Sequence, residues 1–277
     1  MDELVDERRR GLAFSVLGGP TTVVDIAGRR IVMDPTFDPP GQQGYLTKTA
    51  SPAIAATALG KIDVVLVSHD EHPDNLDAGG RRVALAAPLL LTHPRAARRL
   101  GPAAHGLEPW QSIDLPGGDG VGPLTVQAVP AVHGPADGQR NETGHINCEV
   151  TGFVLSGKDV PTVYLSGDNA SVGAVKEITE HVGAVDIAVI FAGAARVPTK
   201  ERGRPLTFTG QRAAAAAELL GAKAVIPAHV DSWAHFTEGR DDFVAAFEEA
   251  GLSHVIAVAP PGRWITFGPT VTRVDAI

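Results

Sequence analysis

Short runs of apolar residues, separated by turn-forming residues, are the dominant pattern along this chain. The run at 64–67 is wholly apolar and predicts a strand that is buried on both faces. β-Branched residues at 21–26, a turn at 27–30 and apolar residues at 31–33 predict a hairpin. The segment 36–46 is rich in Pro, Gly and Gln and is expected to be a loop. The same patterning predicts further strands at 12–17, 89–92, 112–115, 124–129, 152–155, 162–165, 185–191, 224–227, 254–258 and 264–267, and helices at 50–59, 94–100, 172–182, 209–220 and 241–250.

The order of these elements predicts the fold class. Both halves of the chain begin with strands and continue with alternating strands and helices, and no linker divides them. Antiparallel hairpins combined with strand–helix units are typical of two mixed sheets covered by helices. A chain of 277 residues is long enough to bury a sizeable core. We therefore expect a single domain over residues 1–277, of the α/β (α+β) class.

Composition and charge narrow the functional classes. The chain has 24 basic and 32 acidic residues, a net charge of −8, which argues against non-specific binding to nucleic acid. A small anionic substrate stays compatible with this charge, because a bound metal reverses the local field. Cys148 is the only cysteine, so an intrachain disulfide is impossible, and we expect it to be a core or loop residue rather than a nucleophile.

The ends and apolar runs of the sequence predict where the protein resides. The first ten residues are charged and lack the apolar stretch of a signal peptide. No apolar run approaches the roughly 18–20 residues that a membrane span needs. We expect a cytoplasmic protein with no membrane partner, while a homo-oligomer is left open.

Polar residues that suit a metal follow the buried run at 64–67. Two histidines and four acidic residues lie within positions 69–77, with no cysteine nearby. Imidazole and carboxylate are the nitrogen and oxygen ligands of zinc and of harder divalent ions. The alternative is a solvated acidic loop that happens to follow a strand.

Four separate predicted strands end close to a residue that can ligate a metal. These residues are His69, His133, Asp168 and His229. A single histidine at a strand end is more often a hydrogen-bonded structural residue. Four such residues at the same kind of position favour a shared site, because a scaffold's strands deliver functional groups to one rim.

This pattern resembles the metallo-β-lactamase-fold hydrolases. Their first motif, His-x-His-x-Asp-His after a buried strand, is followed on later strands by a His, a bridging Asp and a final His. The opening Gly-Pro-Thr-Thr-Val-Val-Asp-Ile-Ala-Gly and the later Ile-Val-Met-Asp-Pro are similar to the first hairpin of this superfamily, especially of the branch with L-ascorbate-6-phosphate lactonases and the phospholipase D that cleaves N-acyl-phosphatidylethanolamine. The resemblance spans about residues 12–267 and implies a four-layer αβ/βα sandwich.

The first motif departs from the family pattern. The segment His69-Asp-Glu-His-Pro-Asp-Asn75 is one residue longer, so either His72 or Glu71 takes the place of the second histidine. We favour His72, because imidazole suits zinc and the His-x-Asp spacing to Asp74 is kept. Asn75 stands where the family has the last histidine of the motif. Since an amide is the weaker ligand, the second metal site is expected to be empty, weakly filled or filled by a harder ion such as manganese.

The resemblance also implies roles for the matching residues. It implies one or two divalent ions, zinc first and manganese or iron as alternatives, and hydrolysis through a metal-bound hydroxide. Asp168 would bridge the two metal sites or serve the first alone. Asp74 would orient the nucleophile, accept its proton and ligate the second metal. His69, His72 and His133 would hold the first metal, and His229 would complete the second site.

Three weaker features lie outside the motif. His235 follows His229 and would contact substrate or donate a proton to the leaving group, unless it is a surface histidine beside a packed tryptophan. Asp34 and Asp77 are either partners of the ligating histidines or turn and capping residues. A basic loop either grips an anionic substrate or is simply solvated; it contains Arg196, Lys200, Arg202 and Arg204.

Three hypotheses of function follow. The first is a metal-dependent hydrolase of a small ester, lactone or phosphodiester. The second is a nucleic-acid-processing phosphodiesterase of the same fold, against which the acidic charge counts. The third is a non-catalytic metal-binding or ligand-binding protein, which the amide at Asn75 supports.

Overall fold

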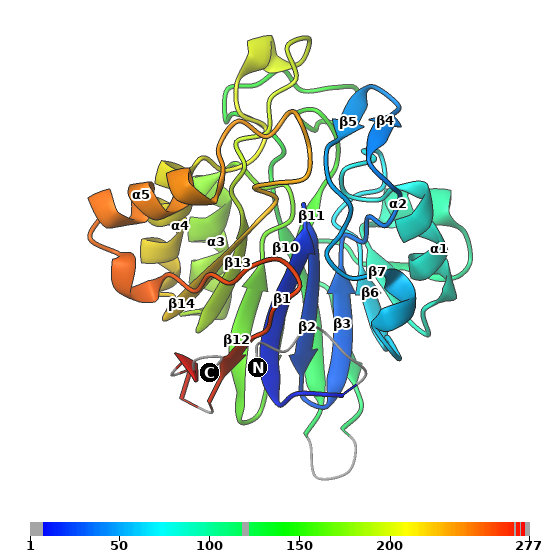
Figure 1. Ribbon diagram of the computed structural model, residues 1–277, viewed down its shortest axis with the longest axis vertical. Helices are drawn as coiled ribbons and strands as arrows, with labels where there is room; N and C mark the ends of the chain where they lie inside the picture. The colour runs from blue at the N-terminus through cyan, green and yellow to red at the C-terminus, as the bar shows by residue number, and fades with distance from the viewer. Residues whose placement is uncertain (1–7, 118–121, 269, 272, 275–277) are drawn as a thin grey trace.

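Two β-sheets pack face to face and helices cover both outer faces, as a computed structural model of the chain shows (Figure 1). The structure describes residues 8–117, 122–268, 270–271 and 273–274. The layers are helix, sheet, sheet and helix, so the predicted four-layer sandwich of mixed sheets is confirmed. Most of the charged first ten residues lie outside the described part of the chain.

The first sheet has eight strands in the order β16-β15-β1-β2-β3-β6-β7-β8. Its early strands pair antiparallel, whereas β3, β6, β7 and β8 run parallel, because each of the later connections crosses over. The strands are β1 (Leu12–Gly18), β2 (Thr21–Ile26), β3 (Arg29–Met33), β6 (Val64–Leu66), β7 (Leu90–Thr92), β8 (Ala104–Gly106), β15 (Ile265–Phe267) and β16 (Arg273–Val274).

The second sheet has six strands in the order β14-β13-β12-β11-β10-β9. Antiparallel pairing runs from β9 to β12, and β12, β13 and β14 are parallel. A separate hairpin of β4 (Gly41–Gln43) and β5 (Leu46–Lys48) stands beyond the sheets. The six strands are β9 (Ser112–Leu115), β10 (Leu124–Pro130), β11 (Thr151–Gly157), β12 (Val160–Leu165), β13 (Ile187–Phe191) and β14 (Ala224–Ala228).

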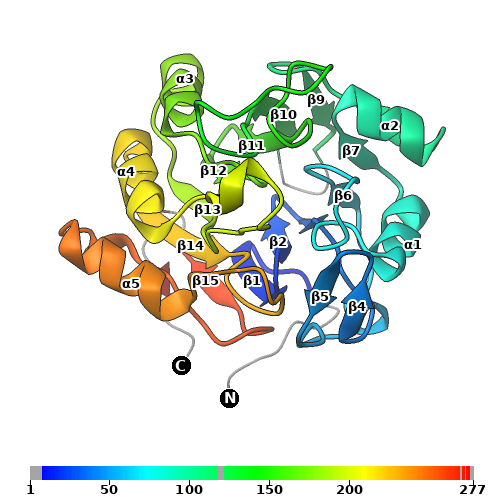
Figure 2. The same cartoon turned by 90° about the horizontal axis from the view of Figure 1, so that it is seen from above.

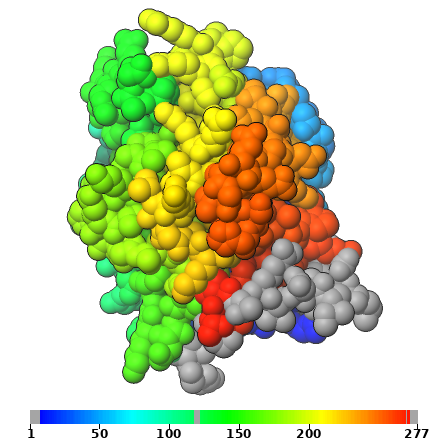
Figure 3. All heavy atoms as spheres, turned by 90° about the vertical axis from the view of Figure 1, so that its left-hand side faces the viewer, coloured from blue at the N-terminus to red at the C-terminus, as the bar shows by residue number. Residues whose placement is uncertain are grey.

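Helices α1 (Ala78–Ala86) and α2 (Pro94–Leu100) cover the first sheet, and α3 (Val172–Val182), α4 (Gly210–Leu220) and α5 (Arg240–Glu249) cover the second (Figures 1 and 2). The last three lie side by side on one face of the molecule (Figure 3). One apolar cluster fills the space between the two sheets. A second lies between the six-stranded sheet and its helices, and a third lies between the eight-stranded sheet and its helices. None of the helices in the described part of the chain has the length and apolar character needed to cross a bilayer.

A buried ion pair fixes the start of the first sheet. Arg30 is fully buried, and its guanidinium donates to both carboxylate oxygens of Asp25 at 2.8 Å. Its Nη1 donates to the Leu59 carbonyl, Nη2 also donates to the Arg8 carbonyl, and Trp264 lies against the group. Burying a charge is costly unless it is paired and hydrogen-bonded, and here both conditions are met.

Several local predictions were wrong. Helix α1 was not predicted, because its Ala-Gly-Gly start has weak helix propensity; Asp77 starts it by accepting from the Gly80 amide at 2.7 Å. The segment 50–59 forms only a 3₁₀ turn at Ala56–Ala58, and the predicted strand 254–258 is reduced to a β-bridge from Ile256 to Val225 after a 3₁₀ turn at Ser253–Val255. The predicted loop at 36–46 contains β4, whose polar residues gave no alternating signal.

Candidate metal centre

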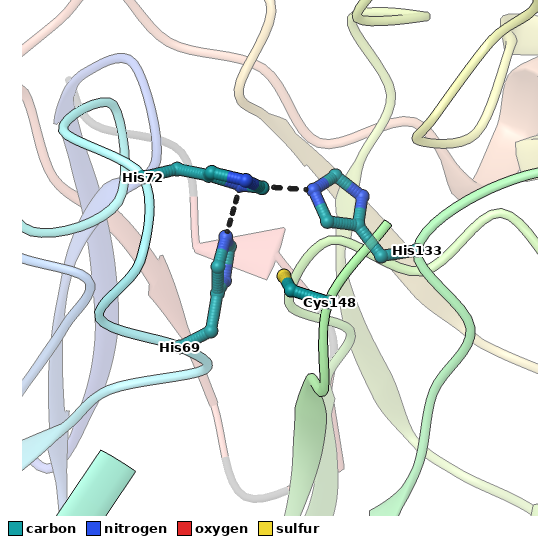
Figure 4. A group of neighbouring side chains, drawn as sticks. All are labelled: His69, His72, His133 and Cys148. Carbon is teal, nitrogen blue, oxygen red and sulfur yellow. Dashed lines mark hydrogen bonds between the residues drawn. The ribbon is translucent and has the colours of Figure 1, made fainter. Parts of the chain in front are cut away.

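Three histidine rings converge at the end of the sandwich. His69 and His72 follow β6, and His133 follows β10 in the opposite sheet. The Nδ1 atom of His72 lies 2.8 Å from Nε2 of His69 and 3.1 Å from Nε2 of His133 (Figure 4). All three side chains are buried. The two sheets therefore supply one compact group of nitrogens.

The outer ring nitrogens determine which atoms face inward. His133 Nδ1 lies 2.9 Å from the Leu206 carbonyl, which only accepts, so this nitrogen carries the proton. His69 Nδ1 lies 3.0 Å from the Ser68 hydroxyl, which itself donates to Asp34, so His69 Nδ1 is also the donor. Both rings then present an unprotonated Nε2 to the centre. Second hydrogen bonds of this kind orient histidines that ligate metals.

Burial keeps these imidazoles neutral. Burial and the neighbouring imidazoles lower the pKa of His69 and of His133 well below its ordinary value. Burial also lowers the pKa of His72 to about 4. If His72 Nδ1 carries a proton, it can donate to Nε2 of His69 or to Nε2 of His133, but not to both. At least two nitrogen lone pairs therefore face each other without a proton between them. A divalent ion held by neutral nitrogens resolves this arrangement, and the donor set fits zinc.

A second cluster joins Asp74, Asp168 and His229 beside the first. His229 Nε2 lies 3.2 Å from Asp74 Oδ2 and 3.4 Å from Asp168 Oδ1. Asp168 Oδ2 lies 3.5 Å from His133 Nε2, so this carboxylate touches both clusters. Asp74 Oδ1 and Asp168 Oδ2 are buried without a hydrogen-bond partner in the described structure. Orphaned buried carboxylate oxygens are what a bound cation satisfies.

The pKa values of Asp74 and Asp168 are shifted in opposite directions. Burial alone would raise the pKa of Asp74, but hydrogen bonds from His229 and His235 outweigh it and hold the pKa well below its usual range. Burial and the nearby Asp74 charge raise the pKa of Asp168 well above its usual range. Two buried carboxylates repel each other, and a cation between them relieves the repulsion.

Backbone geometry places His229 at this position. Its φ is +60°, and its amide donates to the Gly19 carbonyl at 2.7 Å. A Cβ atom on Gly193 would lie 1.9 Å from the His229 carbonyl oxygen, so only glycine fits there. The ring stacks on Phe191 at the end of β13. The neighbouring strand thus supports the turn that carries this histidine.

The two candidates for the second histidine position of the first motif, Glu71 and His72, lie in different surroundings. His72 enters the histidine cluster, whereas Glu71 points outward and its carboxylate pairs with Arg99 at 3.0 Å. Asn75 is buried, and its amide donates to Asp34 at 3.0 Å and to Asp168 at 2.9 Å. Asn75 therefore presents a donor, not a lone pair, toward the second cluster.

Asp34 and Asp77 have different roles. Asp34 accepts from the Ser68 amide and hydroxyl, both at 2.6 Å, so it supports His69 through Ser68. Burial raises the pKa of Asp34 to about 7. Asp77 caps α1 and pairs with buried Lys48 at 3.0 Å, which is the capping alternative.

Cys148 is the residue that the sequence did not assign to this site. One donor atom from each of His69, His72, His133 and Cys148 lies within 4.8 Å of the others. The cysteine is buried, and burial raises the pKa of its thiol. The available signal was only its place in the polar segment after His133, because a single cysteine has no spacing that indicates a ligand set.

His235 and the basic loop border the cluster. His235 Nε2 lies 3.0 Å from Asp74 Oδ2. His235 also lines a neighbouring cavity of about 590 Å³, together with Tyr45, Arg196 and Arg202. The cleft directly over the cluster is lined by Lys200 among others. Arg204 instead pairs with Asp137 and Glu201, so it belongs to the loop's own structure.

Comparison with known proteins places these features in a family. A family profile described as "Beta-lactamase superfamily domain" matches residues 29–230. A protein of Methanosphaerula palustris named UPF0173 metal-dependent hydrolase is 31% identical over 204 residues, 72% of this chain and 82% of the relative. A protein of the same name from Methanocorpusculum labreanum is 28% identical over 205 residues, 73% of this chain and 84% of the relative.

Solved structures share the fold at low identity. An isothiocyanate hydrolase from Delia radicum gut bacteria matches with a TM-score of 0.77 and 18% identity, covering 92% of this chain and 99% of that one. A possible metal-dependent hydrolase from Veillonella parvula matches with a TM-score of 0.78 and 17% identity, covering 93% and 100%. These matches confirm the fold, and they do not single out the ascorbate-6-phosphate lactonase branch.

Proposed function

Since this chain belongs to the β-lactamase superfamily and is a metal-dependent hydrolase of the metallo-β-lactamase fold, we propose that it hydrolyses a small ester, lactone or phosphodiester that carries negative charge. The observation that carries the proposal is the joining of the two clusters by Asp168. Three neutral nitrogens on one side and two carboxylates with an imidazole on the other suit one or two divalent ions.

In this proposal His69, His72 and His133 hold the first ion, and Asp74, Asp168 and His229 hold the second. Such an ion, when bound, lowers the pKa of a bound water and polarises a carbonyl or phosphoryl oxygen. Asp168 links the two clusters, because Oδ2 faces His133 in the first cluster and Oδ1 faces His229 in the second. The Asn75 amide fixes the orientation of Asp168 through its hydrogen bond.

Asp74 and His235 supply the proton chemistry. Asp74 Oδ2 lies beside His229 and His235 and would ligate the second ion, and Oδ1, which has no partner, would orient the attacking water and accept its proton. His235 lies between Asp74 and the neighbouring cavity. In the proposal, protonated His235 would exchange its contact with Asp74 for the leaving oxygen of a substrate in this cavity and would donate a proton to that oxygen.

The cavity beside His235 supports a small substrate of negative charge. Arg196 and Arg202 line it, and Lys200 lines the adjoining cleft. Arg196 is held by the Gly203 carbonyl and the Thr237 hydroxyl, whereas the Arg202 side chain is exposed. A volume of about 590 Å³ is in the range of small-molecule pockets. The net charge of −8 argues against a nucleic-acid substrate.

The test combines metal analysis with turnover. The purified protein is analysed for zinc, manganese and iron, and is then assayed with bis-p-nitrophenyl phosphate and with lactone and ester panels, each with neutral and anionic members. Asp74→Ala should abolish the metal-dependent rate, and His235→Gln should lower it about 10²–10⁴-fold. His254→Gln, at an exposed histidine, is the control. If the reconstituted wild type turns over nothing that Asp74→Ala does not, the hydrolase proposal fails.

A further inference from the structure

The Cys148 thiol faces the three-histidine cluster. Its sulfur points toward the rings of His69, His72 and His133 from below (Figure 4). The side chain is 5% exposed and comes from the segment that leads into β11. Among the hydrogen bonds of the described residues, none involves this thiol. A buried thiol with no other partner is thus aimed at a group of metal-ligating nitrogens.

The surroundings point independently to a ligand at this place. The inward nitrogens of His69 and His133 carry no proton, because their outer nitrogens donate to Ser68 and Leu206. Asp168 Oδ2 is buried, has no hydrogen-bond partner and lies 3.5 Å from His133 Nε2. The cysteine therefore does not stand alone; it is one of several groups that surround a cation-sized centre.

We propose that Cys148 is the fourth protein ligand of the first metal site, which makes it a Cys–His₃ zinc site. The inference rests on the proposed function, because it takes the three histidines as ligands. Binding breaks the S–H bond and forms a sulfur–zinc bond, and the proton goes to solvent. Four protein ligands would leave no open position for water at this ion, so the water of the proposed hydrolysis would be activated at the Asp74–Asp168–His229 cluster.

The proposal separates the metal preferences of the two clusters. A thiolate is a soft ligand and selects zinc, whereas the Asp74–Asp168–His229 cluster is rich in oxygen and also suits manganese. Zinc should therefore bind first and most tightly at the cysteine-containing site. Manganese offered in excess should fill the other cluster and leave that zinc in place.

Zinc K-edge X-ray absorption of the full chain tests the ligand directly. The wild type should show a sulfur at about 2.3 Å besides nitrogen and oxygen at about 2.0–2.1 Å. One sulfur per zinc is expected with one equivalent bound, and half a sulfur per zinc if both clusters hold zinc. Cys148→Ala should lose the sulfur and release zinc to a competing chelator at least about tenfold more readily. Val150→Ala removes buried volume from the same segment without a thiol and should retain both properties.

The outcomes are distinguishable. A loaded wild type with only nitrogen and oxygen around zinc, and with the same zinc affinity as Cys148→Ala, overturns the assignment of Cys148 and leaves the proposed function standing. A wild type that retains no divalent ion from any loading overturns both proposals. If Cys148→Ala does not fold, the wild-type absorption spectrum alone decides, because it needs no variant.

Discussion

Replacing Asn75 by alanine tests the internal support of the second cluster. Asn75 is fully buried, and its amide is the hydrogen-bond donor to both Asp34 and Asp168. The substitution leaves both carboxyl groups without this donor and replaces none of the three proposed ligands of the second ion, Asp74, Asp168 and His229. It therefore separates the amide's structural contribution from metal ligation.

The expected magnitude follows from the two hydrogen bonds. Each contributes about 1–2 kcal/mol to a buried carboxyl oxygen, so the metal-free protein should lose about 2–4 kcal/mol of unfolding free energy. Both bonds are lost with zinc bound as well, but the ion then stabilises the Asp168 carboxylate, so only the loss at Asp34 is uncompensated. The loaded protein should therefore lose about 1–2 kcal/mol.

Urea unfolding of Asn75→Ala and wild type, with a chelator and with saturating zinc, measures both values. Gln211→Ala, on the exposed face of α4, is the control and should change the free energy by less than about 0.5 kcal/mol. A loss below about 1 kcal/mol in the metal-free protein, or an equal loss with and without zinc, would refute this account of Asn75.

Three further predictions concern stability and the position of His229. Because burial raises the pKa of Asp34 to about 7, the folded metal-free chain keeps a proton there that the unfolded chain loses above about pH 4. The contribution of Asp34 to the free energy of unfolding therefore falls as pH rises, by about 2–3 kcal/mol between pH 5 and 7. Asp34→Asn should lack this contribution. If the free energies of unfolding of wild type and Asp34→Asn, measured in urea, change in parallel with pH, the assignment is contradicted. Gly193→Ala should cost about 1–3 kcal/mol and weaken metal retention by displacing His229, measured by Tm and chelator competition, and an unchanged Tm would speak against the close contact. Asp25→Ala should cost about 3–5 kcal/mol in urea unfolding by removing the carboxylate that pairs with buried Arg30, and a loss under 1 kcal/mol would show that the pair is dispensable.

Much of the site was predictable because strand ends carry strong signals. Apolar runs that finish on His69, His133, Asp168 and His229 identified four separate positions, and the fold brings them together. Local sequence did not reveal the direction of each side chain. The choice between Glu71 and His72 depends on the partner Arg99, which lies in a helix and is distant in sequence.

The fold was predictable where hydrophobic patterning is strong and failed where tertiary contacts decide. Helix α1 has two glycines of weak helix propensity directly after its first residue. A Cβ atom on Gly80 would lie 1.6 Å from the Pro35 carbonyl oxygen, so close packing selects glycine against local preference. The function of Cys148 was missed for a related reason, since a single cysteine has no spacing that reveals its neighbours.

The two sheets contribute different members of each cluster, and this bears on how the protein matures. His229 meets Asp74 although 155 positions separate them along the chain. During synthesis from the N-terminus, the early ligands emerge long before β14 and the turn that carries His229. An ion bound by residues from both sheets would then hold the two sheets together reversibly. A chain stalled before β14 would already have the residues of the first site but would lack His229, so it would release an ion from the second cluster that the finished chain retains.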